Sequence, residues 1–178
     1  GTRIPNRAFY GMSSLKTINI PNTITSIGDY AFYGCTLMET GILPSKLTSI
    51  GNYAFSGCKG FTSVTVPGTV KTIGSYAFSG CTSLKTAVIK NGVESIGVRT
   101  FSDCIALESL TLPYAGLSAS KIEENSYSLY ANLFNSSPVE GTYSAGSYGI
   151  PKTLTSITIT GGTRIPNRAF YGMSSLKT

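Results

Sequence analysis

Residues 49–58, Ser-Ile-Gly-Asn-Tyr-Ala-Phe-Ser-Gly-Cys, decide the fold because close copies of this decapeptide recur along the chain at a constant interval. The phenylalanine of the decapeptide is 23 positions from its counterparts on either side (55 − 32 and 78 − 55). The complete series is Phe9, Phe32, Phe55, Phe78 and Phe101. A second series, five positions earlier, is Ile4, Ile27, Ile50, Ile73 and Ile96. Self-similarity at a period of about 20–50 residues is typical of a solenoid, in which each repeat forms one coil.

Each 23-residue repeat contains two apolar segments with the character of β-strands. Residues 47–50 form a short one. Residues 61–67 form a longer one that alternates apolar and polar side chains, with Phe61, Val64 and Val66 expected to face inward. Prolines at the same phase (Pro21, Pro44, Pro67 and Pro113) are expected to end the longer strands, because proline lacks the N–H of a continuing ladder.

The segment between the two strands, residues 51–58, is predicted to form a tight helical or 3₁₀ turn that places Ala54, Phe55 and Cys58 in the core. A single coil cannot bury Phe55 alone. Coils stacked at the strand spacing of about 4.7–4.9 Å would place phenylalanine on phenylalanine and cysteine on cysteine. Stacking of identical coils is therefore expected to be the main source of stability.

The repeated pattern Leu-x-x-Ile-x-Ile-Pro, followed by Ile-Gly-x-x-Ala-Phe-x-Gly-Cys, resembles the BspA-like (Treponema pallidum-type) class of leucine-rich repeats. The resemblance covers residues 1–113 in five near-consecutive copies and returns over residues 152–178. It implies a protein that is secreted or anchored at the bacterial cell surface. It also implies adhesion, with a host extracellular-matrix or cell-surface protein or a glycan as the partner.

The chain is predicted to be a single leucine-rich-repeat domain over residues 1–178. Residues 1–113 would form regular coils, 114–151 an expanded, irregular insertion, and 152–178 resumed coils. Residues 162–178 duplicate residues 1–17, and the offset (162 − 1 = 161) equals 7 × 23. We therefore expect the insertion to occupy a whole number of periods, and the chain to be a fragment of a longer array with tandem super-repeats of this length.

Composition argues against several classes of function. The net charge is +6, but the 14 Lys and Arg are scattered singly, so no nucleic-acid partner is expected. No apolar run approaches the roughly 18–20 residues of a membrane-spanning helix, and no membrane insertion is expected. The chain has no histidine, and its eight carboxylates form no recognisable catalytic pair. We predict that it is not an enzyme and needs no cofactor or metal.

The four cysteines are expected to be buried free thiols. They follow the 23-residue interval, and methionine takes the same phase at Met12 and Met173. Metal sites usually use closely spaced cysteine pairs, which are absent, and stacked cysteines would point in parallel rather than toward each other. The four are Cys35, Cys58, Cys81 and Cys104.

A tyrosine series with arginine at the same phase has two interpretations. Tyr30, Tyr53 and Tyr76 are 23 residues apart, and Arg7 and Arg99 extend the series at either end. One interpretation is an aromatic strip with cationic ends, suited to a glycan or an acidic segment of a partner. The favoured one is a partly buried ladder whose rings cover the phenylalanine core and leave their hydroxyls in water.

The outward side of the longer strands is a second candidate binding surface, since repeat proteins commonly bind on a sheet face. Its neutral, hydroxyl-bearing side chains fit equally with the ordinary strand propensity of threonine. The candidates are Asn19, Ser63, Thr65, Thr86, Ser109 and Thr111. Tyr143 and Tyr148 in the insertion are further candidates, either for binding or for packing the expanded coil.

Together these patterns predict a repeat solenoid, mainly β with short helical or 3₁₀ turns: a right-handed leucine-rich-repeat solenoid of 23-residue coils with short parallel strands on two sides. The predicted function is a non-enzymatic protein- or glycan-binding or adhesion module of a secreted or cell-surface bacterial protein. The alternative is a structural spacer or stalk that associates head to tail through open solenoid ends into a fibre.

Overall fold

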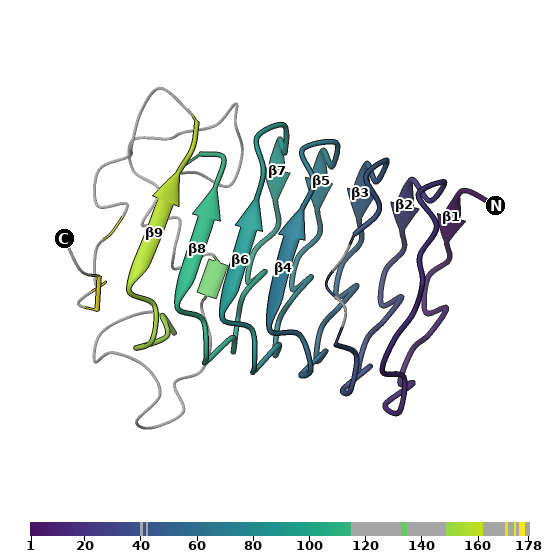
Figure 1. Cartoon of the computed structure of the whole chain (residues 1–178), viewed down its shortest axis with the longest axis horizontal. Helices are drawn as coiled ribbons and strands as arrows, with labels where there is room; N and C mark the ends of the chain where they lie inside the picture. The colour runs from purple at the N-terminus through teal and green to yellow at the C-terminus, as the bar shows by residue number, and fades with distance from the viewer. Residues whose placement is uncertain are drawn as a thin grey trace.

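The computed structural model describes residues 1–39, 41, 43–114, 133–134, 149–161, 170, 173 and 175–176. Over these residues the chain is a stack of coils with two parallel sheets on different sides (Figure 1). The first sheet has the order β1 (Arg3–Ile4), β2 (Ser26–Ile27), β3 (Ser49–Ile50), β5 (Thr72–Ile73) and β7 (Ser95–Ile96). The second has the order β4 (Ser63–Val66), β6 (Thr86–Ile89), β8 (Ser109–Leu112) and β9 (Ser156–Ile159). The solenoid predicted from the sequence is confirmed.

The strand register reproduces the sequence interval. Ile27 pairs with Ile50, and Ile50 pairs with Ile73, so each coil advances the chain by 23 residues. Inside the stack, the Phe55 ring lies 5.2 Å from that of Phe32 and 5.5 Å from that of Phe78, with the ring planes nearly parallel. These three phenylalanines are completely buried, as the repeat pattern predicts.

The segment from Gly51 to Cys58 is a succession of hydrogen-bonded turns instead of a helix. The Ser56 N–H donates to the Tyr53 carbonyl (3.2 Å), within the coil. The Phe55 N–H donates to the Ala77 carbonyl of the next coil (2.8 Å). Every second N–H of the segment donates to a carbonyl of the next coil. The segment therefore adds a third row of hydrogen bonds between coils, besides those of the two sheets. Positive φ angles at Tyr53 (54°) and Gly57 (76°) make this alternation geometrically feasible.

The Ile-Gly step in each repeat is explained by close approach of the neighbouring coil. A Cβ placed on Gly51 would lie 2.6 Å from the backbone N of Asp29. The tight contact is reinforced by side chains, since the Asp29 carboxylate accepts from the Asn52 N–H at 2.7 Å. In the same way, the Asn52 side-chain oxygen accepts from the Ser75 N–H of the following coil at 2.8 Å. Glycine at this phase therefore allows the polar ladder and the short sheet to form together.

The insertion contributes to one enlarged coil. Ser109 in β8 pairs with Ser156 in β9, a step of 47 residues (156 − 109) instead of 23. Leu133 and Phe134 lie where other coils carry Ala-Phe: the Leu133 carbonyl accepts from the Phe101 N–H at 3.0 Å, and the Phe134 ring lies 6.4 Å from the Phe101 ring. About two periods of sequence thus separate two strands that are neighbours in the sheet. Most of the insertion lies outside the described residues.

Candidate functional site

The outward side chains of the four-stranded sheet form two rows that run across the strands. In β4, β6 and β8 the alternation buries the other side chains, as at Val64 and Val66, whereas Ile157 and Ile159 of β9 are partly buried. The pairing places Ser63, Thr86, Ser109 and Ser156 in one row. The other row contains Thr65, Val88, Thr111 and Thr158. Seven of these eight side chains carry a hydroxyl group, so the face offers a regular array of donors and acceptors.

Five of the predicted strand-face residues, from Ser63 to Thr111, lie in these rows, whereas Asn19 does not. Asn19 is exposed, but no strand forms around it. Gly41 of the second coil explains this difference: it takes the place of the inward Val64, and a Cβ there would collide with the Ser63 carbonyl. Glycine at a strand position weakens the strand. Tyr143 and Tyr148 lie outside the described residues.

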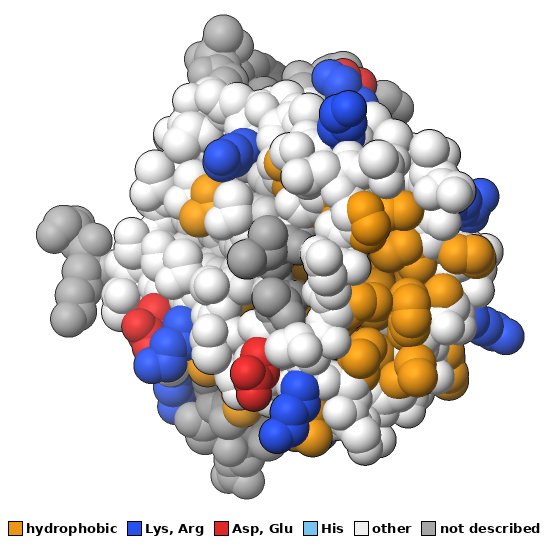
Figure 2. All heavy atoms as spheres, turned by 45° about the vertical axis from the view of Figure 1, so that its right-hand side comes forward, with side chains coloured by type: hydrophobic (Ala, Val, Ile, Leu, Met, Phe, Trp, Pro, Cys, Tyr) orange, Lys and Arg blue, Asp and Glu red, His pale blue; other side chains and the backbone are white. Residues whose placement is uncertain are grey.

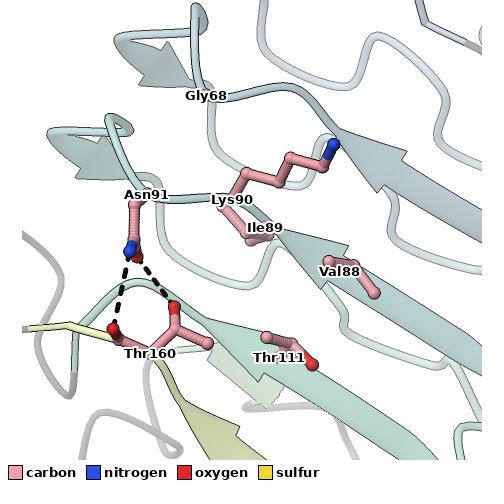
Figure 3. A pocket seen from close by; sticks show the side chains of 7 residues that line it. All are labelled: Gly68, Val88, Ile89, Lys90, Asn91, Thr111 and Thr160. Carbon is pink, nitrogen blue, oxygen red and sulfur yellow. Dashed lines mark hydrogen bonds between the residues drawn. The ribbon is translucent and has the colours of Figure 1, made fainter.

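A hollow of about 380 Å³ opens where β6 and β8 end (Figure 3). Its wall includes Val88, Thr111 and the backbone at Gly68. Asn91 and Thr160 close one side, because the Thr160 hydroxyl donates to the Asn91 side-chain oxygen at 2.7 Å. The Lys90 side chain extends from the end of β6 toward β4. The hollow therefore combines apolar, amide and cationic groups at the margin of the hydroxyl rows.

A second hollow, of about 470 Å³, lies on the other side of Lys90. Ser63 and Thr65 line it together with Leu43 and Pro67, and Glu39 stands at its rim. The ion pairs among the described residues are Lys71–Glu94 (2.8 Å) and Lys85–Glu108 (3.4 Å). Lys90 and Glu39 thus have no ionic partner in the described part of the chain, although they line the same hollow. Neither residue belongs to a repeated pattern, so sequence reasoning missed both.

The tyrosine series forms the predicted ladder. The Tyr53 ring stacks on Tyr30 at 4.8 Å and on Tyr76 at 4.5 Å. The Arg7 guanidinium lies 5.5 Å from the Tyr30 ring, and the Arg99 guanidinium 5.6 Å from the Tyr76 ring. The three tyrosines are half-buried. Burial, followed by the neighbouring phenols, raises the pKa of Tyr53, so its hydroxyl stays protonated at neutral pH.

The cysteines are buried free thiols, as predicted. The Cys58 Sγ donates to the Phe32 carbonyl at 3.3 Å, and Cys81 repeats this contact with Phe55. Burial raises the pKa of both thiols, which keeps them neutral and inert. Over the residues that the structure describes, no cluster of three or more His, Cys, Asp or Glu could hold a metal ion. No helix in the same part of the chain has the length and apolar character needed to cross a membrane.

Comparison with known proteins agrees with the geometry. The family model of the BspA-type leucine-rich repeat region matches residues 2–134 in six copies. The crystal structure of the Treponema pallidum leucine-rich repeat protein is 25% identical, with a TM-score of 0.70 over 99% of this chain and 72% of that one. A leucine-rich repeat protein of Bacteroides ovatus is 28% identical (TM-score 0.61), and the match covers 88% of this chain and 37% of that one.

The pneumococcal vaccine antigen PcpA shares the fold at 20% identity, with a TM-score of 0.61 over 88% of this chain and 36% of that one. The chain therefore spans little more than a third of the length of the Bacteroides and pneumococcal proteins. None of the curated protein sequences matches it.

Proposed function

The chain belongs to the BspA-type leucine-rich repeat family, and from this premise we propose that it is a binding or adhesion module of a secreted or cell-surface bacterial protein. The proposed partner is a host extracellular-matrix or cell-surface protein or a glycan. The leucine-rich-repeat solenoid is a scaffold of the non-enzymatic kind, and we propose that this chain has no enzymatic activity. The absence of histidine from the sequence supports that proposal, because histidine is the commonest general base.

The observation that carries the proposal is the hydroxyl face of β4, β6, β8 and β9 with a hollow on each side of Lys90. The donors and acceptors of the face repeat from strand to strand, and the Lys90 and Glu39 charges are uncompensated within the described residues. A partner that covers this face would meet many hydroxyl groups, two opposite charges and the apolar Val88 and Leu43. A mixture of polar, charged and apolar groups is typical of interfaces between proteins that also exist apart. We propose the insertion loop, with Tyr143 and Tyr148, as a second point of contact.

The test is a binding screen against matrix proteins, cell-surface proteins and glycans with matched variants. Thr65→Arg with Thr111→Arg would fill both hollows. Thr72→Arg with Ser95→Arg makes the same kind of change on exposed positions of the other sheet. Loss of binding in the first double variant and retention in the second supports the sheet face. Equal binding by both double variants, or no binding by the unaltered chain to any member of the screen, would reject it.

A specific observation favours the spacer as the second candidate. Figure 2 turns the N-terminal side forward and shows hydrophobic side chains gathered there. Tyr10, Met12 and Leu37 of the first two coils are 52%, 50% and 48% exposed. Phe9 of the first coil stacks on Phe32 with the ring centroids 5.0 Å apart. We propose that a second copy of the chain could cover this surface by head-to-tail association, a contact that does not close on itself.

Light scattering at increasing protein concentration tests the spacer. A particle mass that grows with concentration supports the spacer if the double variant Met12→Glu with Leu37→Glu abolishes the growth, because a charge at this surface opposes apolar association. The matched control is Val98→Glu, at a position 42% exposed on the fifth coil. A chain that remains monomeric at every concentration would contradict association through this surface.

A further inference from the structure

A strip of five side chains, one from each of the first five coils, shares an unusual backbone conformation. Its members are Arg7, Tyr30, Tyr53, Tyr76 and Arg99. Their φ angles are 58°, 57°, 54°, 58° and 56°, all in the left-handed region. This region disfavours side chains with a Cβ and favours glycine, or secondarily asparagine and aspartate. The fold therefore requires a positive φ at this position, but the requirement does not select tyrosine or arginine.

A second position of the same turn, four residues later, also has a positive φ and can be compared with the first. There a second positive φ falls on Gly11, Gly34, Gly57 and Gly80, with Asp103 in the fifth coil. At that position the chain uses residues that tolerate the conformation. At the first position it uses large side chains in all five coils, in spite of the strain. Strained positions of this kind cluster at functional sites, which directs attention to what these five side chains do.

The stacking determines which parts of the tyrosines a ligand can reach. The Tyr53 ring has a neighbour on each face at 4.8 and 4.5 Å, with the planes within 6° of parallel. Nothing can insert between the rings, so sugar stacking on an aromatic face is excluded. The edges and hydroxyl groups remain. The Arg99 Nη1 donates to the Tyr76 hydroxyl oxygen at 2.6 Å, and the Tyr53 hydroxyl interacts with that of Tyr76.

Both ends of the strip are cationic. Within the described residues neither Arg7 nor Arg99 forms an ion pair. The two arginines are four coils apart ((99 − 7)/23), which is about 19 Å at the spacing of strands in a sheet. Between them the strip carries phenolic hydroxyl groups, one on each of the three middle coils. Hydroxyl donors flanked by guanidinium groups select a ligand that carries anions and many acceptor oxygens along an extended backbone.

The backbone decides between a peptide and a glycan. A peptide would dock most readily by adding main-chain hydrogen bonds. Here the N–H groups of the strip are occupied: Tyr30 donates to Asn52, Tyr53 to Ser75 and Tyr76 to Val98, each at 2.9 Å. The two hollows on the sheet face are lined by other residues. The strip therefore lacks the free main-chain donors that fix an extended peptide.

We propose that the Arg7–Tyr30–Tyr53–Tyr76–Arg99 strip binds an extended anionic oligosaccharide whose carboxylates or sulfates meet the two guanidinium groups. The sugar hydroxyl and ring oxygens accept hydrogen bonds from the tyrosine edge. The inference rests on the proposed function as a binding module and assigns a ligand class to a surface separate from the sheet face. Because the arginines are far apart, a chain of several sugars is needed to reach both.

Calorimetric titration of the full 178-residue chain tests the proposal. The probes are heparin octasaccharide for sulfate, oligogalacturonate octamer for carboxylate, a neutral malto-oligosaccharide and poly-glutamate. Arg7→Gln with Arg99→Gln removes the two charges. Tyr30→Phe with Tyr53→Phe and Tyr76→Phe keeps the rings and removes the hydroxyls. Lys46→Gln with Lys59→Gln is the matched control, since it lowers the net charge equally at two exposed lysines without an ionic partner in the described residues.

The expected result is binding of at least one anionic octasaccharide and none of the neutral chain. The arginine double variant should weaken binding about tenfold and the tyrosine triple variant several-fold, with little change in the lysine control. Equal weakening by the lysine control would show that only the net charge matters, and this would overturn the proposal. Tighter binding of poly-glutamate than of the oligosaccharides, or no oligosaccharide binding at all, would overturn it as well. Loss caused only by Thr65→Arg with Thr111→Arg would refute the strip and leave the sheet-face function standing.

Discussion

Tyr53 and Tyr76 stack with their ring centroids 4.5 Å apart and their planes within 6°, although both residues have a left-handed backbone. The two facts are connected. A positive φ turns the side chain of each coil in the same direction, and the 23-residue register repeats that direction on the next coil. The ladder is thus a consequence of the turn, and side-chain stacking offsets part of the conformational strain.

Substitution of Tyr53 by glycine should give a more stable protein than substitution by alanine. Both variants lose the stacking, but only alanine keeps the strain at a φ of 54°, so we expect a difference of about 1–2 kcal/mol in the free energy of unfolding. Denaturant titration measures it. The control is the same pair of substitutions at Thr72 in β5, which has an ordinary strand backbone. There the glycine variant should be less stable than the alanine variant. The same order at both positions would contradict the assigned conformation.

Phe55→Ala should destabilise the fold by about 3–5 kcal/mol. The side chain is fully buried and stacks on Phe32 and Phe78, so its removal leaves a cavity between two coils. Phe9→Ala is the matched comparison. Phe9 is only partly buried and stacks on Phe32 at 5.0 Å, and its loss should cost clearly less. Equal unfolding midpoints for the two variants would show that burial between coils is not the source of stability.

Two glycines of the third and second coils should respond differently to alanine. Gly51→Ala brings a Cβ to 2.6 Å from the Asp29 backbone N, so the coils must separate, and we expect a cost of about 3 kcal/mol. Gly34→Ala meets nothing closer than 3.7 Å and suffers only from its φ of 70°, about 1–2 kcal/mol. Thermal unfolding of both variants checks the order. A more stable Gly51→Ala protein would refute the close approach.

The periodic part of the fold could be predicted because each repeated residue faces the same surroundings. The interval between Phe32, Phe55 and Phe78 determines the register, and alternation over residues 61–67 determines which side chains are buried. The turn conformation could not be predicted, because tyrosine and arginine carry no signal for a positive φ. The break over residues 114–151 indicated an expanded coil, but its length alone does not determine that Ser109 pairs with Ser156.

The candidate site was predicted only where it repeats. Ser63, Thr65 and Thr111 follow from strand alternation, whereas Lys90 and Glu39 occur once and come together through the packing of two different coils. Asn19 is exposed but lies outside the strands, because a local alternating pattern does not guarantee pairing with the next coil. Sequence periodicity therefore identifies the face, and the structure adds its charges and hollows.

The buried cysteines predict a loss of stability in alkaline solution. The pKa of Cys81 is raised above its ordinary value of 9.0, first by burial and then by Cys104, with a smaller opposing effect of a backbone hydrogen bond. Above about pH 9 the unfolded chain releases its thiol protons while the folded chain keeps them. Each such thiol then lowers the free energy of unfolding by about 1.4 kcal/mol per pH unit. The contribution is complete below that pH and is lost as the pH rises.

Denaturant titrations between neutral pH and about pH 10.5 measure this slope, and Cys81→Ala isolates the thiol from the lysines and tyrosines that titrate in the same range. Alanine cannot lose a proton, so the variant should be less stable than the parent at neutral pH, because a cavity replaces the sulfur, and should close the gap as the pH rises. The two stability curves should converge because the folded parent keeps the Cys81 thiol protonated, with the Sγ donating to the Phe55 carbonyl at 3.3 Å inside the core. If the two curves stayed parallel, the thiol would have to ionise equally in the folded and unfolded states, which a fully buried side chain does not allow.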